Sequence, residues 1–350
     1  MVQSALGPVP ACELGPTLSH EHLFINLMRE RRGDGLLNDT SLMADELRVF
    51  AEQGGRTIFD LTTAELTPGS TPGSDPGFTA TSAGQTRDPS NVVAIQEVSK
   101  ATGVNVILGA GRYRDSFLPH DLIDRIGIVG LAEEMVRDIE EGLPGTSVRA
   151  GLIGEIGADK WFISAHEERV FRAAARAQLR TGVPIYTHAA RWPVGLEQVA
   201  LLREEGVPPD RIAAGHADTV PEPSYAHRVA DQGVYIGIDT VNTSAFTEVS
   251  SRVKTIGDLV RAGHIDRILL SHDVCLTSQL TAHGGNGFGF IMGGFRDRLL
   301  ESGLSREQFD HIVVVNPARY LTGDDRNHPA MAPPTSIVGL NGSSFDTRFG

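Results

Sequence analysis

Cysteine and long apolar runs are scarce in this 350-residue chain, and each scarcity excludes a class of protein. The two cysteines, Cys12 and Cys275, are too few for a disulfide framework or for a zinc site built from thiolates. No segment approaches the roughly 18 uncharged apolar residues of a membrane-spanning helix, and the first residues do not resemble a signal peptide. We therefore expect a cytoplasmic protein without a membrane partner, in which histidine and carboxylate hold any metal.

An excess of positive charge is missing as well. The formal net charge is −13, so a polyanion such as nucleic acid would be repelled on average. Hydrophobic residues make up 40% of the chain, which is ample for one large buried core. The expected partner is a small-molecule substrate.

The apolar runs that are present recur at intervals, each followed by an amphipathic stretch long enough for a helix. Eight runs can be counted, at residues 17–24, 57–61, 104–110, 151–156, 184–188, 212–216, 234–239 and 268–273. The expected helices include residues 43–53, 90–102, 131–141, 167–180, 195–205, 224–231, 253–262 and 290–302. Eight alternations without an internal repeat predict an α/β fold, a closed parallel (β/α)8 TIM barrel formed by one domain over residues 1–322.

Three segments fall outside this alternation. Residues 65–86 are rich in Pro, Gly, Ser and Thr, which predicts a lid or a surface excursion. Residues 276–290 contain HGGNGFG without the spacing of a phosphate loop, so we expect a mobile active-site loop. The tail, residues 323–350, is expected to be poorly ordered or used in subunit contact, with no catalytic role.

Histidines gather at the ends of the predicted strands, where barrel enzymes place their chemistry. His20, His22, His188 and His216 lie within these strands or at their C-terminal ends. Residues two apart in a strand share a face, so His20 and His22 project together into the barrel while Glu21 points outward. A single strand histidine is more often a hydrogen-bonded core residue, but four of them beside two acids favour a metal site.

Those two acids are Glu155 and Asp273, each of which closes a largely apolar run. Burying a carboxylate there costs free energy unless it is paired or binds a metal. A salt bridge to arginine is the alternative for each. A carboxylate that bridges two metal ions, with an aspartate that binds one ion and accepts a proton, accounts for both acids with one geometry.

The succession SHEHLF, RAGLIGEIG, TGVPIYTHAA, AAGHAD, GIDT, LLSHD and NPARYL resembles the phosphotriesterase family of the amidohydrolase superfamily over nearly the whole chain. The resemblance implies a homodimer with a binuclear metal site at the C-terminal ends of the strands. It implies that one, more buried ion is held by His20, His22 and Asp273, the more exposed one by His188 and His216, with a bridging carboxylate and hydroxide. Two divalent ions are expected, Zn²⁺ first and Mn²⁺ or Co²⁺ as alternatives.

The bridging position departs from that of the best-known members of the family, which use a carbamylated lysine. None of the chain's three lysines, Lys100, Lys160 and Lys254, lies at a predicted strand end. Gly154 takes the place of that lysine, and Glu155 in GEIG resembles the bridging glutamate of the family's phosphotriesterase-homology branch.

A second departure concerns the proton relay of the family's phosphotriester hydrolases. Thr240 and Thr219 stand where the relay has a histidine and an aspartate, so the relay is absent or rebuilt. Asp218 and Asp239 remain nearby, either as groups that orient the metal ligands or as structural caps.

The predicted reaction is metal-dependent hydrolysis. A metal-bridging hydroxide attacks the substrate, whose oxygen docks on the ion held by His188 and His216, and Asp273 passes the proton to the leaving group. The glutamate bridge and the missing relay favour a carboxylic ester, lactone or amide, with a phosphotriester as the alternative.

Candidate substrate-binding residues follow the third and fifth strands. They are Tyr113, Arg112, Arg114 and Arg191, which could bind a substrate carboxylate, sulfonate or carbonyl. For each arginine, a solvated surface position is the alternative.

Two other classes of protein fit parts of the pattern. A mononuclear deaminase shares the first histidine pair and the last aspartate, but it needs a glutamate just beyond His188, where this chain has Ala189, Ala190 and Arg191. A non-catalytic small-molecule binding protein on the same fold is the second alternative, and metal analysis combined with turnover assays separates it from a hydrolase.

Overall fold

The computed structural model describes residues 1–68, 89–158, 160–243 and 245–323. Most of the Pro- and Gly-rich excursion predicted over residues 65–86, and the tail beyond residue 323, lie outside the described residues. None of the described helices is both long and apolar enough to cross a bilayer.

Eight parallel strands form the centre of the molecule. In sheet order they are β3 (Thr17–Glu21), β6 (Thr57–Asp60), β7 (Asn105–Ala110), β8 (Leu152–Gly157), β9 (Ile185–His188), β10 (Ile212–Ala214), β11 (Tyr235–Ile238) and β12 (Ile268–Leu270). The Ser19 hydroxyl donates to the Leu270 carbonyl at 3.2 Å, and the Ser271 hydroxyl accepts from the His20 N–H at 2.9 Å. These bonds join the first strand to the last, so the sheet forms a nearly closed barrel and the predicted fold is confirmed.

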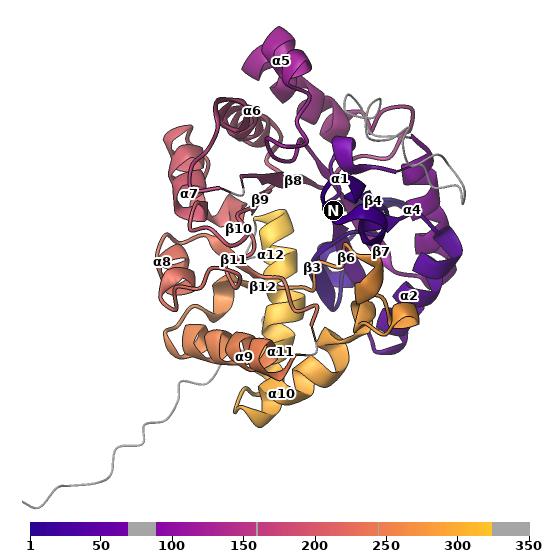
Figure 1. Ribbon diagram of the computed structural model, residues 1–350, viewed down its shortest axis with the longest axis vertical. Coiled ribbons are helices and arrows are strands. Elements are labelled where there is room, and N and C mark those ends of the chain that lie inside the picture. Colours follow the sequence, from indigo (N-terminus) through magenta and orange to yellow (C-terminus); the bar gives the residue numbers. More distant parts are fainter. Residues whose placement is uncertain (69–88, 159, 244, 324–350) are drawn as a thin grey trace, which may run out of the picture.

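Helices surround the barrel as a ring (Figure 1). They are α2 (Thr40–Glu52), α4 (Pro89–Thr102), α5 (His120–Glu140), α6 (Ala165–Thr181), α7 (Gly195–Glu204), α8 (Tyr225–Ala230), α9 (Phe246–Arg261) and α10 (Arg296–Glu301). The local sequence of α6 shows why such a helix forms. The Ser164 hydroxyl accepts from the Glu167 N–H, the Glu167 carboxylate accepts from the Ser164 N–H, and Gly182 ends the helix at a φ of 78°.

The first helical turns of α5 were not predicted. Sequence periodicity placed that helix at residues 131–141, whereas it begins at His120. Gly127 interrupts the helix with a φ of 61°, so two helical pieces follow one another and their apolar residues fall on different faces.

Short elements complete the N-terminal part of the chain. They are β1 (Val2–Ser4), β2 (Gly7–Val9), β4 (Ile25–Asn26), β5 (Leu36–Leu37) and α1 (Met28–Arg31). The pair β1 and β2, and the pair β4 and β5, are antiparallel and lie outside the barrel sheet.

One end of the barrel is covered by the last described helix, α12 (Asn316–Thr322), which follows the short helix α11 (Arg306–Asp310). Tyr320 of α12 is buried, and its ring centroid lies 5.1 Å from that of Tyr235 and 6.1 Å from that of Tyr186. These rings join Phe59, Ile107 and other strand residues in one apolar cluster inside the barrel. The interior is therefore a packed core at this end, and the opposite, C-terminal end is left for chemistry.

Candidate metal centre

The six predicted metal ligands come from five strands and meet at the C-terminal end of the barrel. In chain order they are His20 in β3, His22 just after it, Glu155 in β8, His188 at the end of β9, His216 after β10 and Asp273 after β12. Parallel strands point the same way, so residues far apart in the sequence become neighbours at one rim.

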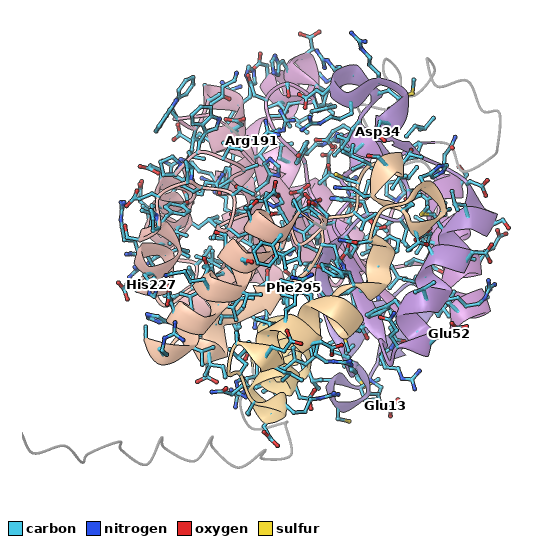
Figure 2. The ribbon with its side chains drawn as sticks, turned by 60° about the horizontal axis from the view of Figure 1, so that its bottom comes forward. Glu13, Asp34, Glu52, Arg191, His227 and Phe295 are labelled. Carbon is cyan, nitrogen blue, oxygen red and sulfur yellow. The ribbon has the colours of Figure 1, made fainter. Side chains whose placement is uncertain are left out.

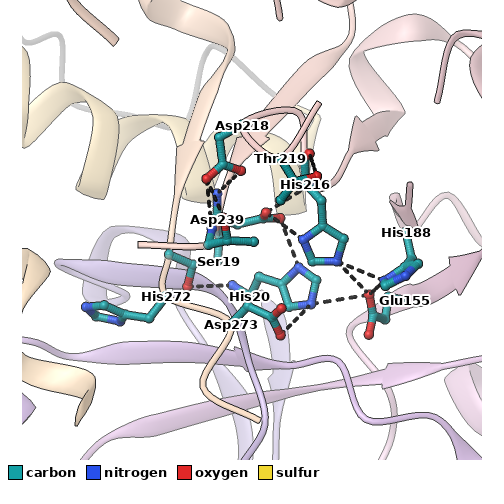
Figure 3. A network of polar contacts seen from close by, with 12 residues as sticks. Ser19, His20, Glu155, His188, His216, Asp218, Thr219, Asp239, His272 and Asp273 are labelled. Atoms are coloured by element: carbon teal, nitrogen blue, oxygen red, sulfur yellow. Dashed lines mark hydrogen bonds and ion pairs between the residues drawn. The ribbon is translucent and has the colours of Figure 1, made fainter. Parts of the chain in front are cut away.

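The Glu155 carboxylate lies among four imidazoles, and Figure 3 shows those of His20, His188 and His216 beside it. Its Oε2 is 2.8 Å from His188 Nδ1, 3.4 Å from His216 Nε2 and 3.4 Å from His20 Nε2. Its Oε1 is 3.5 Å from His22 Nε2. Burial alone would raise the pKa of Glu155, but His188 and His20 hold it well below its usual range. This anion, shared by both histidine pairs, stands where a bridging ligand would.

The residues present fit two metal ions. Glu155 groups with His20 and His22 on one side and with His188 and His216 on the other, and the ligand atoms of each group lie within 4.8 Å of one another. Within the described part of the chain, the buried Nε2 of His20 forms no hydrogen bond of good geometry, although Glu155 Oε2 lies 3.4 Å away. Such an atom costs free energy unless something else binds it, and a divalent cation would do so.

The electrostatic field of the site favours a cation. Burial alone would lower the pKa of His20, yet Glu155 and Asp239 outweigh it and raise this pKa from 6.5 to about 10. Carboxylates that stabilise an extra proton on an imidazole stabilise a metal ion for the same reason.

Asp239 orients two of the ligands. Its Oδ2 is 3.0 Å from His20 Nδ1 and its Oδ1 is 2.9 Å from His216 Nδ1, while the Tyr186 hydroxyl donates to Oδ2 at 2.7 Å. Each imidazole N–H that points to Asp239 leaves the Nε2 lone pair facing Glu155. Asp239 thus has contacts of both predicted kinds, since it bonds to two candidate ligands and also accepts from the His216 backbone N–H at 2.9 Å.

His22 has its own partner, because the Thr62 hydroxyl lies 2.9 Å from His22 Nδ1. Sequence reasoning missed both Thr62 and Tyr186. Thr62 lies outside the quoted motifs and Tyr186 lies inside TGVPIYTHAA, but each reaches its partner only through the register of another strand.

Asp273 approaches the first histidine pair. Its Oδ1 is 3.3 Å from His22 Nε2 and 3.8 Å from His20 Nε2. The backbone of Asp273 has a φ of 55°, and that of His216 a φ of 57°, a region that non-glycine residues seldom adopt. Strain of this kind persists where surrounding bonds hold it, and it gathers at functional sites.

Glu21 supplies such bonds next to Asp273. Its buried carboxylate accepts from the N–H groups of His272 and Val274, each at 2.9 Å, and from the Ser271 hydroxyl at 2.8 Å. The expectation that Glu21 merely points outward was thus incomplete, since it holds the turn that presents Asp273. The signal was available in the sequence, because an acid inside an apolar strand needs partners.

A different network occupies the predicted position of the relay. Asp218 accepts from the Thr240 hydroxyl at 2.5 Å and from Arg252 Nε at 2.7 Å, and Arg252 Nη2 donates to the Thr240 hydroxyl at 2.7 Å. The Thr219 hydroxyl accepts from the Arg191 N–H at 2.7 Å. Thr240 is therefore bonded to an arginine from α9, whereas Thr219 bonds to the segment after β9 and to the His216 carbonyl.

A cavity of about 810 Å³ opens over the metal ligands. It is lined in part by Arg31, Tyr113, Arg114, Arg191 and Trp192. Arg191 follows β9, and Figure 2 shows it at the end of the molecule opposite Glu13, which precedes β3. Leu276 and Gln279 of the predicted active-site loop also line the cavity.

The three residues predicted after the third strand make different contacts. The Tyr113 hydroxyl lies 3.3 Å from His188 Nε2, and burial raises its pKa well above 10, so it stays protonated and can donate. Arg114 pairs with Glu30 at 2.5 Å and stacks over the Tyr113 ring. Arg112 instead bonds to Glu134 of α5 at 3.0 Å and lines a separate recess, so its predicted role in substrate binding gains no support from its position.

The model of the phosphotriesterase family matches residues 1–321. This chain belongs to that family. A metal-dependent hydrolase of small molecules is therefore what the chain encodes, as the motifs predicted.

Individual relatives agree with this assignment. The chain is 32% identical to the phosphotriesterase homology protein of Escherichia coli over 88% of this chain and 98% of that protein. It is 29% identical to the N-acetyltaurine hydrolase of Salmo salar over 92% and 97% of the two chains. The solved structure of a lactonase from Listeria monocytogenes matches with a TM-score of 0.79 at 27% identity, over 92% of this chain and 98% of that one.

Proposed function

We propose that this phosphotriesterase-family protein is a binuclear hydrolase that cleaves a carboxylic amide, ester or lactone. In this proposal Glu155 bridges two divalent ions, His20, His22 and Asp273 hold one of them, and His188 and His216 hold the other. The observation that carries the proposal is the single Glu155 carboxylate within 3.5 Å of four imidazoles. Zn²⁺ is the proposed metal, since histidine and carboxylate are its usual ligands besides cysteine.

When bound, divalent ions lower the pKa of coordinated water to about 7 and so supply a nucleophile at neutral pH. Side chains of the protein provide the proton transfer and the hydrogen bonding. Asp273, whose side chain is 18% exposed, faces the cavity and can accept the proton of the attacking water and return it to the leaving group. The protonated Tyr113 hydroxyl beside His188 can donate to the oxygen on which negative charge develops.

The cavity also favours a substrate with an anionic group. Among the described residues, Arg31 and Arg191 line the cavity without a carboxylate at ion-pair distance, unlike Arg114 and Arg252, which are paired. Arg191 is held at a φ of 70°, and its N–H is fixed by the Thr219 hydroxyl. N-acetyltaurine, the substrate named for one relative, is an amide that carries a sulfonate.

A hydrolysis screen on metal-loaded protein tests the proposal. The panel contains N-acyl amino acids, N-acyl amino sulfonates, lactones, aryl esters and phosphotriesters, with Glu155→Ala as the control. We expect turnover of an acyl compound that Glu155→Ala abolishes. A preference for phosphotriesters would instead support the second candidate, to which the aryldialkylphosphatase of Saccharolobus solfataricus, 34% identical over 76% of this chain, points. Two bound ions without any turnover would indicate a binding protein.

The proposed preference of the cavity for an anionic substrate has its own test. Arg191→Gln should lower kcat/KM for an anionic acyl substrate about tenfold or more, because a hydrogen bond to a charged group is worth roughly 1.5–3 kcal/mol. The same change should leave the neutral methyl ester of that substrate unaffected. Arg48→Gln, on α2, is the matched control. Equal losses on both substrates would contradict the assignment.

A further inference from the structure

A second group of metal-ligand side chains lies outside the cavity, where the segment between β7 and α5 meets the first turns of α5 and α6. Asp115 belongs to that segment, His120 is the first residue of α5, and His166 is the second residue of α6. One ligand atom from each lies within 4.8 Å of the other two. We propose that these three residues bind a further divalent transition-metal ion, such as Zn²⁺ or Ni²⁺.

The distances suit such an ion. Asp115 Oδ1 is 3.2 Å from His120 Nε2 and 3.9 Å from His166 Nδ1. Bonds of about 2.0–2.1 Å at tetrahedral angles place neighbouring ligand atoms roughly 3.3 Å apart. The two imidazole rings are nearly parallel, at 6°, with centroids 4.2 Å apart. Because imidazole lone pairs lie in the plane of the ring, at least one of these stacked rings must rotate about its side-chain bonds before all three atoms reach bonding distance of one ion.

Neighbouring groups orient His166 and Asp115 for this role, whereas His120 Nε2 lies 3.1 Å from the Asp115 carbonyl oxygen and must give up that contact to bind an ion. His166 Nε2 lies 3.1 Å from Asp124 Oδ1, so a proton held there leaves the lone pair of Nδ1 toward Asp115. Asp124 is itself held by Arg169. The Ser164 hydroxyl donates to Asp115 Oδ1 at 3.0 Å, which orients that carboxylate.

The charge of the three residues and their exposure to solvent also suit a divalent cation. Asp115 and Asp124 bring two negative charges, and Arg169 is the cation paired with one of them. The side chains of His120, Asp115 and His166 are 46%, 26% and 24% exposed, so an ion and its remaining water ligands can enter from solvent. Without an ion, the same residues form hydrogen bonds and ion pairs, and that is the outcome the experiment must distinguish.

The site is connected to the cavity through a short piece of chain. Asp115 is two residues beyond Tyr113 and next to Arg114, both of which line the cavity. Its N–H donates to Glu167 Oε1 at 2.9 Å, at the start of α6. An ion at this site ties the segment that carries Tyr113 to two helices, so its binding should slow local opening of that segment.

Calorimetric titration of the holoprotein with Zn²⁺ and, separately, with Ni²⁺ tests the proposal, starting from protein that already holds its active-site ions. We expect one additional equivalent in the wild type. His120→Ala and His166→Ala should each lose it, and Asp124→Asn should weaken it about 10- to 100-fold. His227→Ala is the matched control, because His227 and His264 form another histidine pair at the surface, with ring centroids 6.1 Å apart.

Two further measurements distinguish loss of the additional ion from loss of folding. Each variant must keep the circular dichroism spectrum and the active-site metal content of the wild type, which shows that it folds. Hydrogen exchange over residues 111–119 should slow when the additional equivalent binds to the wild type, and it should not change in His166→Ala. No additional equivalent in the wild type, or one that survives both histidine substitutions, would overturn the proposal.

Discussion

Asp239 shows how much of the metal centre depends on one buried side chain that does not itself face Glu155. Its two oxygens accept from His20, His216 and Tyr186, and its pKa stays well below the usual range because His216 and His20 outweigh the effect of burial. A fixed anion at this point sets which nitrogen of each imidazole carries the proton. Glu21 acts similarly on the turn before Asp273.

The first prediction concerns this residue. Asp239→Asn should weaken metal binding about 10- to 100-fold while the protein stays folded, because an amide cannot accept from both imidazoles and Tyr186 as the carboxylate does. Metal titration against a competing chelator measures the change. Glu46→Gln is the matched control, since Glu46 is also buried but accepts from Thr281 and Ala282, away from the metal ligands. Equal losses in the two variants would contradict the orienting role.

At the scale of elements, the strand ends were the predictable part of the site. Apolar runs located the strands, and histidines and carboxylates in or just after five of them marked the candidate ligands. The partners from other strands, such as Thr62 and Tyr186, could not be predicted, since their positions depend on barrel register. Arg112 and Arg114 were indistinguishable in sequence because only the turn after β7 decides which one faces the cavity. The sequence did not predict that α12 covers one end of the barrel, because α12 packs on residues of strands that are far from it in the sequence.

The segment after β9 allows a direct test at this scale. Trp192 lines the cavity, and its ring centroid is 4.7 Å from that of Trp161, the only other tryptophan of the chain. Binding of a product carboxylate should therefore change the tryptophan emission of the wild type. The change should persist in Trp161→Phe and disappear in Trp192→Phe. An unaltered response in Trp192→Phe would show that ligand binds elsewhere.

At the scale of the whole molecule, we expect metal binding and folding to be coupled. The metal-free protein buries carboxylates and imidazoles at the open end of its barrel, and His20 has a pKa of about 10 in that state against 6.5 for the free side chain. A pKa raised by folding stabilises the fold fully below pH 6.5, and this contribution is lost as the pH rises through 10.

The melting temperature should change with pH in the direction given by the raised pKa of His20. Between about pH 6.5 and 10 the Tm of chelator-treated protein should fall, whereas metal-loaded protein, in which a metal replaces the proton on His20, should lack this decrease. The gap in Tm between the two forms is then expected to widen with pH. Paired melting curves at several pH values measure it, and a gap that narrows across this range would be inconsistent with the field described for the site.

The central claim is that Glu155 bridges two metal ions, and anomalous X-ray scattering from crystals of metal-loaded protein tests it most directly. The account predicts two anomalous peaks about 3.5–4 Å apart, with Glu155 bonded to both ions and no modified lysine nearby. A single peak, or two peaks with Glu155 bonded to neither, would contradict it.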